Sequence, residues 1–131
     1  MRYVLLALAL FALTSSARAA PSDWGAAHQI EIRLANFSFT PNKIELKSGG
    51  AYRLHLVNTA NGGHNFDAPE FFAAAQVAPS DQARIRKGTV ELKKGESVDI
   101  RLVAPAPASY KLRCSHFLHS SFGMTGEILV R

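Results

Sequence analysis

Short segments with alternating apolar and polar residues recur between residues 29 and 131, and they constrain the fold more than any other feature. A period of two is typical of strands that bury one face. The strands expected from this pattern are 29–35, 43–47, 52–56, 89–92, 98–103, 110–115 and 127–130. Short strands separated by turn residues predict an all-β fold, an antiparallel Greek-key sandwich or barrel.

Two parts of this pattern carry more specific expectations. Residues 69–87 interrupt the alternation and are rich in helix-forming residues, so we expect a short helical excursion there. A Lys-Lys-Gly-Glu turn joins segments 89–92 and 98–103, which predicts a hairpin. Three aromatic residues in the alternating segments are expected in the core: Phe37, Phe39 and Phe66.

The first residues have the organisation of an export signal. Arg2 precedes an unbroken apolar run at 4–13, and Ala-Arg-Ala at 17–19 fits the small-x-small cleavage pattern. A membrane anchor is the alternative, but the run is shorter than the roughly 20 residues that span a bilayer. We therefore expect a periplasmic protein with no membrane span. Its expected parts are a signal peptide (1–19), a polar lead-in (20–28) and one domain (29–131).

The charge of the chain argues against nucleic-acid binding. Lys and Arg number 15 and Asp and Glu 10, and two of the arginines belong to the expected leader. The remaining excess is small and scattered, whereas nucleic-acid binding needs a concentrated basic face. Only residues 84–87 approach one. We expect a solvated loop there, with a docking patch for an acidic partner as the alternative.

A single cysteine, Cys114, makes an internal disulfide impossible. This is informative because exported proteins can form disulfides. Such a cysteine is buried and inert, intermolecular, or used for chemistry. The residues near Cys114 in the sequence indicate which of these possibilities applies.

Cys114, His119 and Met124 lie in one loop between two expected strands. Thiolate, imidazole and thioether together select copper, and a Cys/His/His set with a long axial Met describes an electron-transfer copper site. The second imidazole must come from elsewhere in the chain. His64 follows an expected strand and stands beside glycines that permit close backbone approach.

The segments GGHNF and YKLRCSHFLHSSFGMTGEILV resemble the cupredoxin (blue copper) family, over about residues 29–131. Four residues separate Cys114 from His119 and four more separate His119 from Met124, a spacing like that of rusticyanin and auracyanin. The resemblance implies one copper ion. It implies His64 and His119 as equatorial nitrogen ligands, Cys114 as the thiolate and Met124 as the axial sulfur.

The same resemblance bears on three neighbouring residues. It implies that the side chain of Asn65 is tied to Ser115 and so clamps the ligand loops before metal arrives; capping of a turn by Asn65 is the alternative. His116 lies two residues after Cys114, and neither ligand spacing of the family selects it. We expect His116 to be a packed or partly exposed residue that is not a ligand.

A mononuclear site with four protein ligands leaves no room for substrate, so we expect an electron-transfer protein that is not an enzyme. We also expect a monomer. Phe117, Leu118 and Phe122 surround His119 in sequence and are expected to form an apolar surface where a redox protein docks. A periplasmic copper carrier or copper-tolerance protein is the alternative. A copper enzyme would need a second site, for which five histidines without a His-x-His pair are too few.

Overall fold

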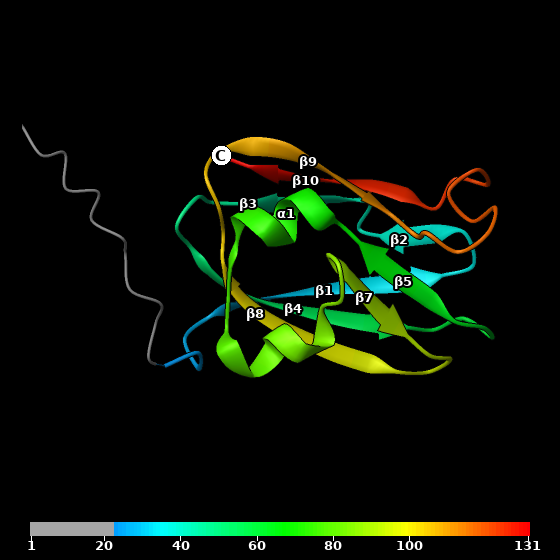
Figure 1. Cartoon of the computed structure of the whole chain (residues 1–131), viewed down its shortest axis with the longest axis horizontal. Coiled ribbons are helices and arrows are strands. Elements are labelled where there is room, and N and C mark those ends of the chain that lie inside the picture. Colours follow the sequence, from blue (N-terminus) through cyan, green and yellow to red (C-terminus); the bar gives the residue numbers. More distant parts are fainter. Residues whose placement is uncertain (1–22) are drawn as a thin grey trace, which may run out of the picture.

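A computed structural model describes residues 23–131, and the expected signal peptide lies outside the described residues. Two five-stranded sheets pack face to face (Figure 1). From edge to edge, the first sheet consists of β2 (Ser38–Thr40), β1 (His28–Ala35), β4 (Ala51–Asn58), β8 (Ser97–Val103) and β6 (Gln76–Val77). The second consists of β3 (Lys43–Leu46), β10 (Thr125–Val130), β9 (Ala108–Arg113), β5 (His64–Asp67) and β7 (Thr89–Leu92).

This architecture confirms the predicted all-β sandwich and its helical excursion. The excursion contains α1 (Pro69–Ala74) and the 3-10 helix η1 (Pro79–Arg84), separated by the short β6. A proline in the first turn starts each helix, where its missing N–H costs no hydrogen bond. Most strand pairs are antiparallel, but β1 pairs with β4 in parallel and β3 pairs with β10 in parallel.

The predicted hairpin at 89–103 is wrong. Its two strands are present, but β7 pairs with β5 in one sheet and β8 pairs with β4 in the other. The turn between them crosses from sheet to sheet, and the buried Asn58 fixes it by donating hydrogen bonds to the carbonyl oxygens of Leu92 and Lys93. Alternation identifies a strand and its buried face, but it does not identify the strand beside it.

The core lies between the sheets and is built from the inward residues of both. Phe39 and Phe66 are buried as predicted and pack edge to face, with ring centroids 6.1 Å apart. Phe37 is a correction, because 43% of it is exposed. It stands between β1 and β2 with a φ of 57°, so the alternation of the strands does not extend through it.

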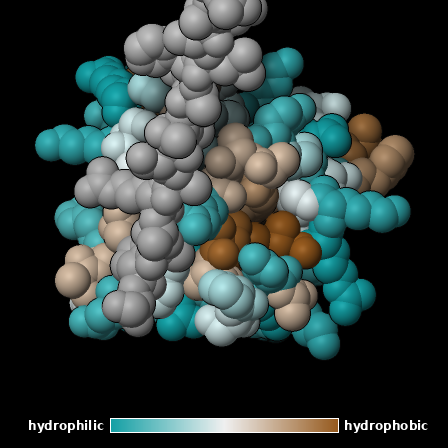
Figure 2. All heavy atoms as spheres, turned by 60° about the vertical axis from the view of Figure 1, so that its left-hand side comes forward, coloured by the Kyte–Doolittle hydropathy of each residue, from teal (hydrophilic) through white to brown (hydrophobic). Residues whose placement is uncertain are grey.

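The sandwich has two distinct ends. The loop between β9 and β10, orange to red in Figure 1, lies at the same end as the start of β5. The large hydrophobic residues that are exposed in the described part of the chain belong to this loop or to the β1–β2 turn: Phe37, Phe117, Leu118 and Phe122. Figure 2 brings the opposite side forward and shows hydrophilic residues around a hydrophobic area near the centre of the view.

Candidate metal centre

Two neighbouring parts of the second sheet carry the candidate ligands. His64 is the first residue of β5, and Cys114 directly follows β9. Pairing of Arg113 with Thr125 fixes the ends of the β9–β10 loop. Within the loop, the Cys114 N–H donates to the Met124 carbonyl and the Met124 N–H donates to the His119 carbonyl, both at 3.0 Å. The backbone therefore folds the loop back on itself beside β5.

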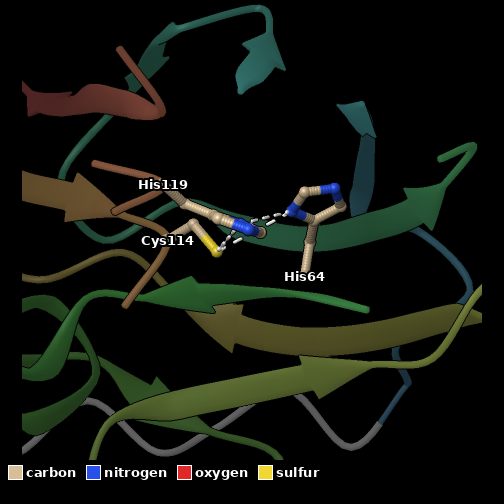
Figure 3. Close-up of side chains that lie close together, drawn as sticks. All are labelled: His64, Cys114 and His119. Atoms are coloured by element: carbon tan, nitrogen blue, oxygen red, sulfur yellow. Dashed lines mark hydrogen bonds between the residues drawn. The ribbon is translucent and has the colours of Figure 1, made fainter. Parts of the chain in front are cut away.

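Three potential ligand atoms meet where these segments come together (Figure 3). The Nδ1 atoms of His64 and His119 are 3.1 Å apart. The Sγ atom of Cys114 lies 3.4 Å from Nδ1 of His119 and 3.8 Å from Nδ1 of His64. A point equidistant from three atoms at these separations is about 2.0 Å from each, close to the bond lengths that nitrogen and thiolate ligands make with zinc. The triangle therefore has the size that one such ion requires.

Burial sets the protonation of this group. Cys114 is fully buried and 3% of His64 is exposed, whereas His119 is half-buried. Burial lowers the pKa of His64, and the neighbouring His119 and His116 lower it further. Burial also raises the pKa of the Cys114 thiol. At neutral pH the metal-free site therefore holds a neutral imidazole and a thiol, and a metal ion must displace the thiol proton.

The thioether of Met124 belongs to a completely buried residue. The backbone of Met124 is bonded to both Cys114 and His119, so the predicted axial ligand is adjacent to two predicted equatorial ones. The donor set at this end of the sandwich is thus two imidazoles, one thiol and one thioether. Copper is the ion that prefers this combination of ligands.

Asn65 and Ser115 connect the two ligand-bearing segments. The Asn65 side chain donates from Nδ2 to the Ser115 hydroxyl and accepts from the Ser115 N–H at Oδ1, each at 2.8 Å. The backbone N–H of Asn65 also points to the Cys114 Sγ at 3.5 Å. Asn65, which follows His64, therefore ties Ser115, which follows Cys114, to β5.

His116 lies beside the three ligand atoms but does not share their meeting point. Its ring stacks on that of His64 with centroids 6.3 Å apart, and its Nε2 lies 2.7 Å from Oε1 of Glu91. The side chain is 31% exposed. The structure thus places His116 as the partly exposed neighbour that we expected.

Phe37 and Glu91 lie near the site, although the sequence marks neither as a site residue. Phe37 packs edge to face on the His119 ring, with ring centroids 5.2 Å apart, and its ring centroid lies 5.4 Å from that of Phe122. Glu91 joins Asn65 and His116 by hydrogen bonds. No local signal marks either one: Phe37 looks like a strand residue, and Glu91 looks like an ordinary outward residue of β7. Only long-range packing brings them to the site.

Exposed apolar side chains lie in the ligand loop beside His119 and in the β1–β2 turn. We call this surface the apolar rim and define it as Phe37, Phe117, Leu118 and Phe122. Phe117 is 87% exposed and Phe122 64% exposed. Exposed hydrophobic groups at this density are uncommon unless a surface has a binding role.

A two-sheet sandwich with the side chains of His64, Cys114, His119 and Met124 at one end defines a copper-binding protein. The sequence profile of the cupredoxin-like domain matches residues 3–130, and the chain belongs to that family. The predicted family resemblance is confirmed, and the cluster suits one copper ion. No helix within residues 23–131 is long and apolar enough to cross a membrane.

Solved structures show the same fold. The chain is 22% identical to dithionite-reduced auracyanin from Roseiflexus castenholzii, with a TM-score of 0.60 over 82% of this chain and 99% of that one. It is 20% identical to auracyanin B, with a TM-score of 0.60 over 87% and 92%. It is also 20% identical to the McoA multicopper oxidase of Aquifex aeolicus, with a TM-score of 0.64 over 87% and 31%. A comparison with curated proteins finds no match.

Proposed function

We propose that the protein transfers single electrons between redox partners in the periplasm by means of one copper ion, which supplies a reversible one-electron couple. The observation that carries the proposal is the meeting of His64 Nδ1, His119 Nδ1 and Cys114 Sγ within 3.8 Å of one another. In this proposal His64 and His119 are the equatorial nitrogen ligands, Cys114 is the thiolate and Met124 is the axial sulfur.

The surrounding residues favour electron transfer because they hold the ligands in place without metal. The two hydrogen bonds between Asn65 and Ser115 tie β5 to the ligand loop. The Asn65 N–H reaches the Cys114 sulfur, a contact that influences the potential of a thiolate-bound copper. A geometry fixed by the protein serves both oxidation states, so little reorganisation accompanies the transfer.

The apolar rim is the proposed docking surface for the redox partner. Among the proposed ligands, His119 is only half-buried, whereas His64, Cys114 and Met124 are buried. The imidazole of His119 therefore offers the shortest exit from the site to the surface. Phe37 packs on this ring, and Phe117, Leu118 and Phe122 extend the apolar area around it. Burial of such a surface against a partner would exclude water from the path of the electron.

We further propose that the chain is an electron carrier and not an enzyme. Auracyanins and a multicopper oxidase share its fold, and the fold alone does not separate carriers from oxidases. The four proposed ligands leave no open position for a substrate. With five histidines in the chain, two of them in the proposed site, a second copper centre of the oxidase kind lacks ligands.

The test is to add Cu(II) to the purified protein and to measure stoichiometry, visible absorption and voltammetry. We expect one copper per chain, an intense thiolate-to-copper absorption and a reversible one-electron couple. Copper bound without a reversible couple would favour a copper carrier or copper-tolerance protein that transfers no electrons. A Cys114→Ser variant is the control, because it keeps the imidazoles and removes the thiolate responsible for the absorption.

A further inference from the structure

Glu91 lies next to the candidate site without being one of its ligands. It stands on β7 directly opposite Asn65 of β5. Its Oε2 accepts a hydrogen bond from Asn65 Nδ2 at 3.2 Å, and its Oε1 lies 2.7 Å from Nε2 of His116. Because a carboxylate only accepts, His116 carries its proton on Nε2. One side chain therefore holds a residue from each ligand-bearing segment.

These two contacts reach the ligands through one intermediate residue each. Asn65 is bonded to Ser115 and directs its backbone N–H at the Cys114 sulfur. His116 stacks on His64 and lies 5.3 Å from the His119 ring, measured between centroids. Loss of the Glu91 carboxylate would leave His116 without this hydrogen bond, and the Asn65 side chain would be held only by its hydrogen bonds to Ser115.

The charge of Glu91 also acts on the site. Its carboxylate is one residue away from His64, through the stacked ring of His116, and one residue away from Cys114, through Asn65. A negative charge at this position acts on both an imidazole ligand and the sulfur. A negative charge stabilises Cu(II) relative to Cu(I), since the more highly charged ion is attracted more strongly. Glu91 is 56% exposed, so solvent and salt reduce the effect.

We propose that Glu91 is a positioning residue of the copper site, which fixes Asn65 and His116 beside the ligands and lowers the reduction potential through its negative charge. The inference rests on the proposed function, because it takes the metal to bind at His64, Cys114 and His119. It adds a residue that touches none of the ligands directly.

Two substitutions separate the charge from the hydrogen bonds. Glu91→Gln keeps the size and can still form hydrogen bonds with Asn65 and His116, but it removes the charge. Glu91→Ala removes both. Glu45→Gln is the matched control. Glu45 lies on β3 and pairs with Leu129 near the far end of β10, so this substitution removes the same charge away from the ligand loop.

The first measurement is the midpoint potential of the copper-loaded proteins at low ionic strength and constant pH. For Glu91→Gln we expect a higher potential with the visible absorption retained. The change should correspond to about a threefold or greater shift in preference toward Cu(I). Glu45→Gln should leave the potential nearly unchanged. A potential for Glu91→Gln no different from that of Glu45→Gln would overturn the electrostatic role.

The second measurement uses the copper-free proteins and follows amide hydrogen exchange at Ser115, whose N–H is bonded to Asn65. Glu91→Ala should accelerate this exchange several-fold, whereas Glu91→Gln and Glu45→Gln should not. Unchanged exchange in Glu91→Ala would overturn the positioning role. Failure of the wild-type protein to bind copper would refute the proposed function and the electrostatic role together, while the exchange rates would still decide whether Glu91 holds Asn65.

Discussion

The Nδ1 atoms of His64 and His119 lie 3.1 Å apart, although 55 positions separate the two residues in the chain. Neither ring reaches the other by local folding. β5 and the β9–β10 loop each bring one imidazole to the same end of the second sheet. This relationship makes the two histidines chemically distinct from His116, which is nearer to Cys114 in sequence.

Replacement of His119 by Ala should abolish the intense visible absorption of the copper-loaded protein, because it removes one of the three convergent ligand atoms. Replacement of His116 by Ala should preserve the absorption and the stoichiometry, since His116 is bonded to Glu91 instead. Titration with Cu(II) followed by absorption spectroscopy checks both. Loss of the band in His116→Ala with retention in His119→Ala would reverse the ligand assignment.

Replacement of Asn65 by Ala should weaken copper retention and change the reduction potential. It should also lower the free energy of unfolding of the metal-free protein by about 1–3 kcal/mol, since it leaves the partly buried Ser115 N–H without its acceptor. Chelator competition, voltammetry and urea denaturation measure the three effects. Asn61→Ala is the control, because Asn61 is exposed in the turn before β5. Equal behaviour of the two variants would show that Asn65 is no clamp.

Introduction of charge into the apolar rim should slow electron transfer without loss of copper. Phe122→Asp should reduce the rate constant with a redox protein partner by about tenfold or more, because a charge must then be desolvated on docking. Stopped-flow absorption measures the rate. Ala106→Asp places the same charge in the exposed turn before β9, away from the ligand loop, and should leave the rate unchanged. Equal rates in wild type and Phe122→Asp would exclude the rim as the docking surface.

The metal-free protein should be most stable between about pH 6.5 and 9, with a loss on either side. The folded-state pKa of His64 is lowered from 6.5, so the unfolded chain binds the proton more readily and stability falls as the pH drops below that value. The folded-state pKa of Cys114 is raised from 9.0, so stability falls as the pH rises above it. Urea denaturation at a series of pH values measures the free energy of unfolding and tests both the acid and the alkaline loss of stability. In Cys114→Ala the loss of stability at alkaline pH should disappear, whereas the loss at acid pH should remain.

Asp81 anchors the helical excursion to the first sheet and should be important for stability. Its carboxylate accepts hydrogen bonds from the backbone N–H and the guanidinium of Arg101, at 2.8–2.9 Å. Asp81→Ala should lower the free energy of unfolding by about 2 kcal/mol, because the Arg101 N–H loses its acceptor. Copper binding should be retained. Ser80→Ala next to it removes one weaker contact and should have a smaller effect in the same denaturation experiment.

The alternation of core and surface residues can be predicted from the amino-acid sequence, which also contains the order and spacing of Cys114, His119 and Met124. These properties are local, because a strand period of two and the length of one loop depend only on residues that are close together in the sequence. They suffice to predict a β-sandwich with a helical excursion. They also suffice to indicate a soft-metal site.

Which segments lie side by side follows from the packing of the whole domain and not from local sequence. This packing placed β7 next to β5 and not next to β8, and it brought Glu91 to Asn65 and Phe37 to His119. Pairing depends on how both sheets bury their apolar faces at once, and any strand with the right alternation could satisfy that requirement locally. The geometry of the site, and the residues that hold it, are therefore properties of the packed molecule.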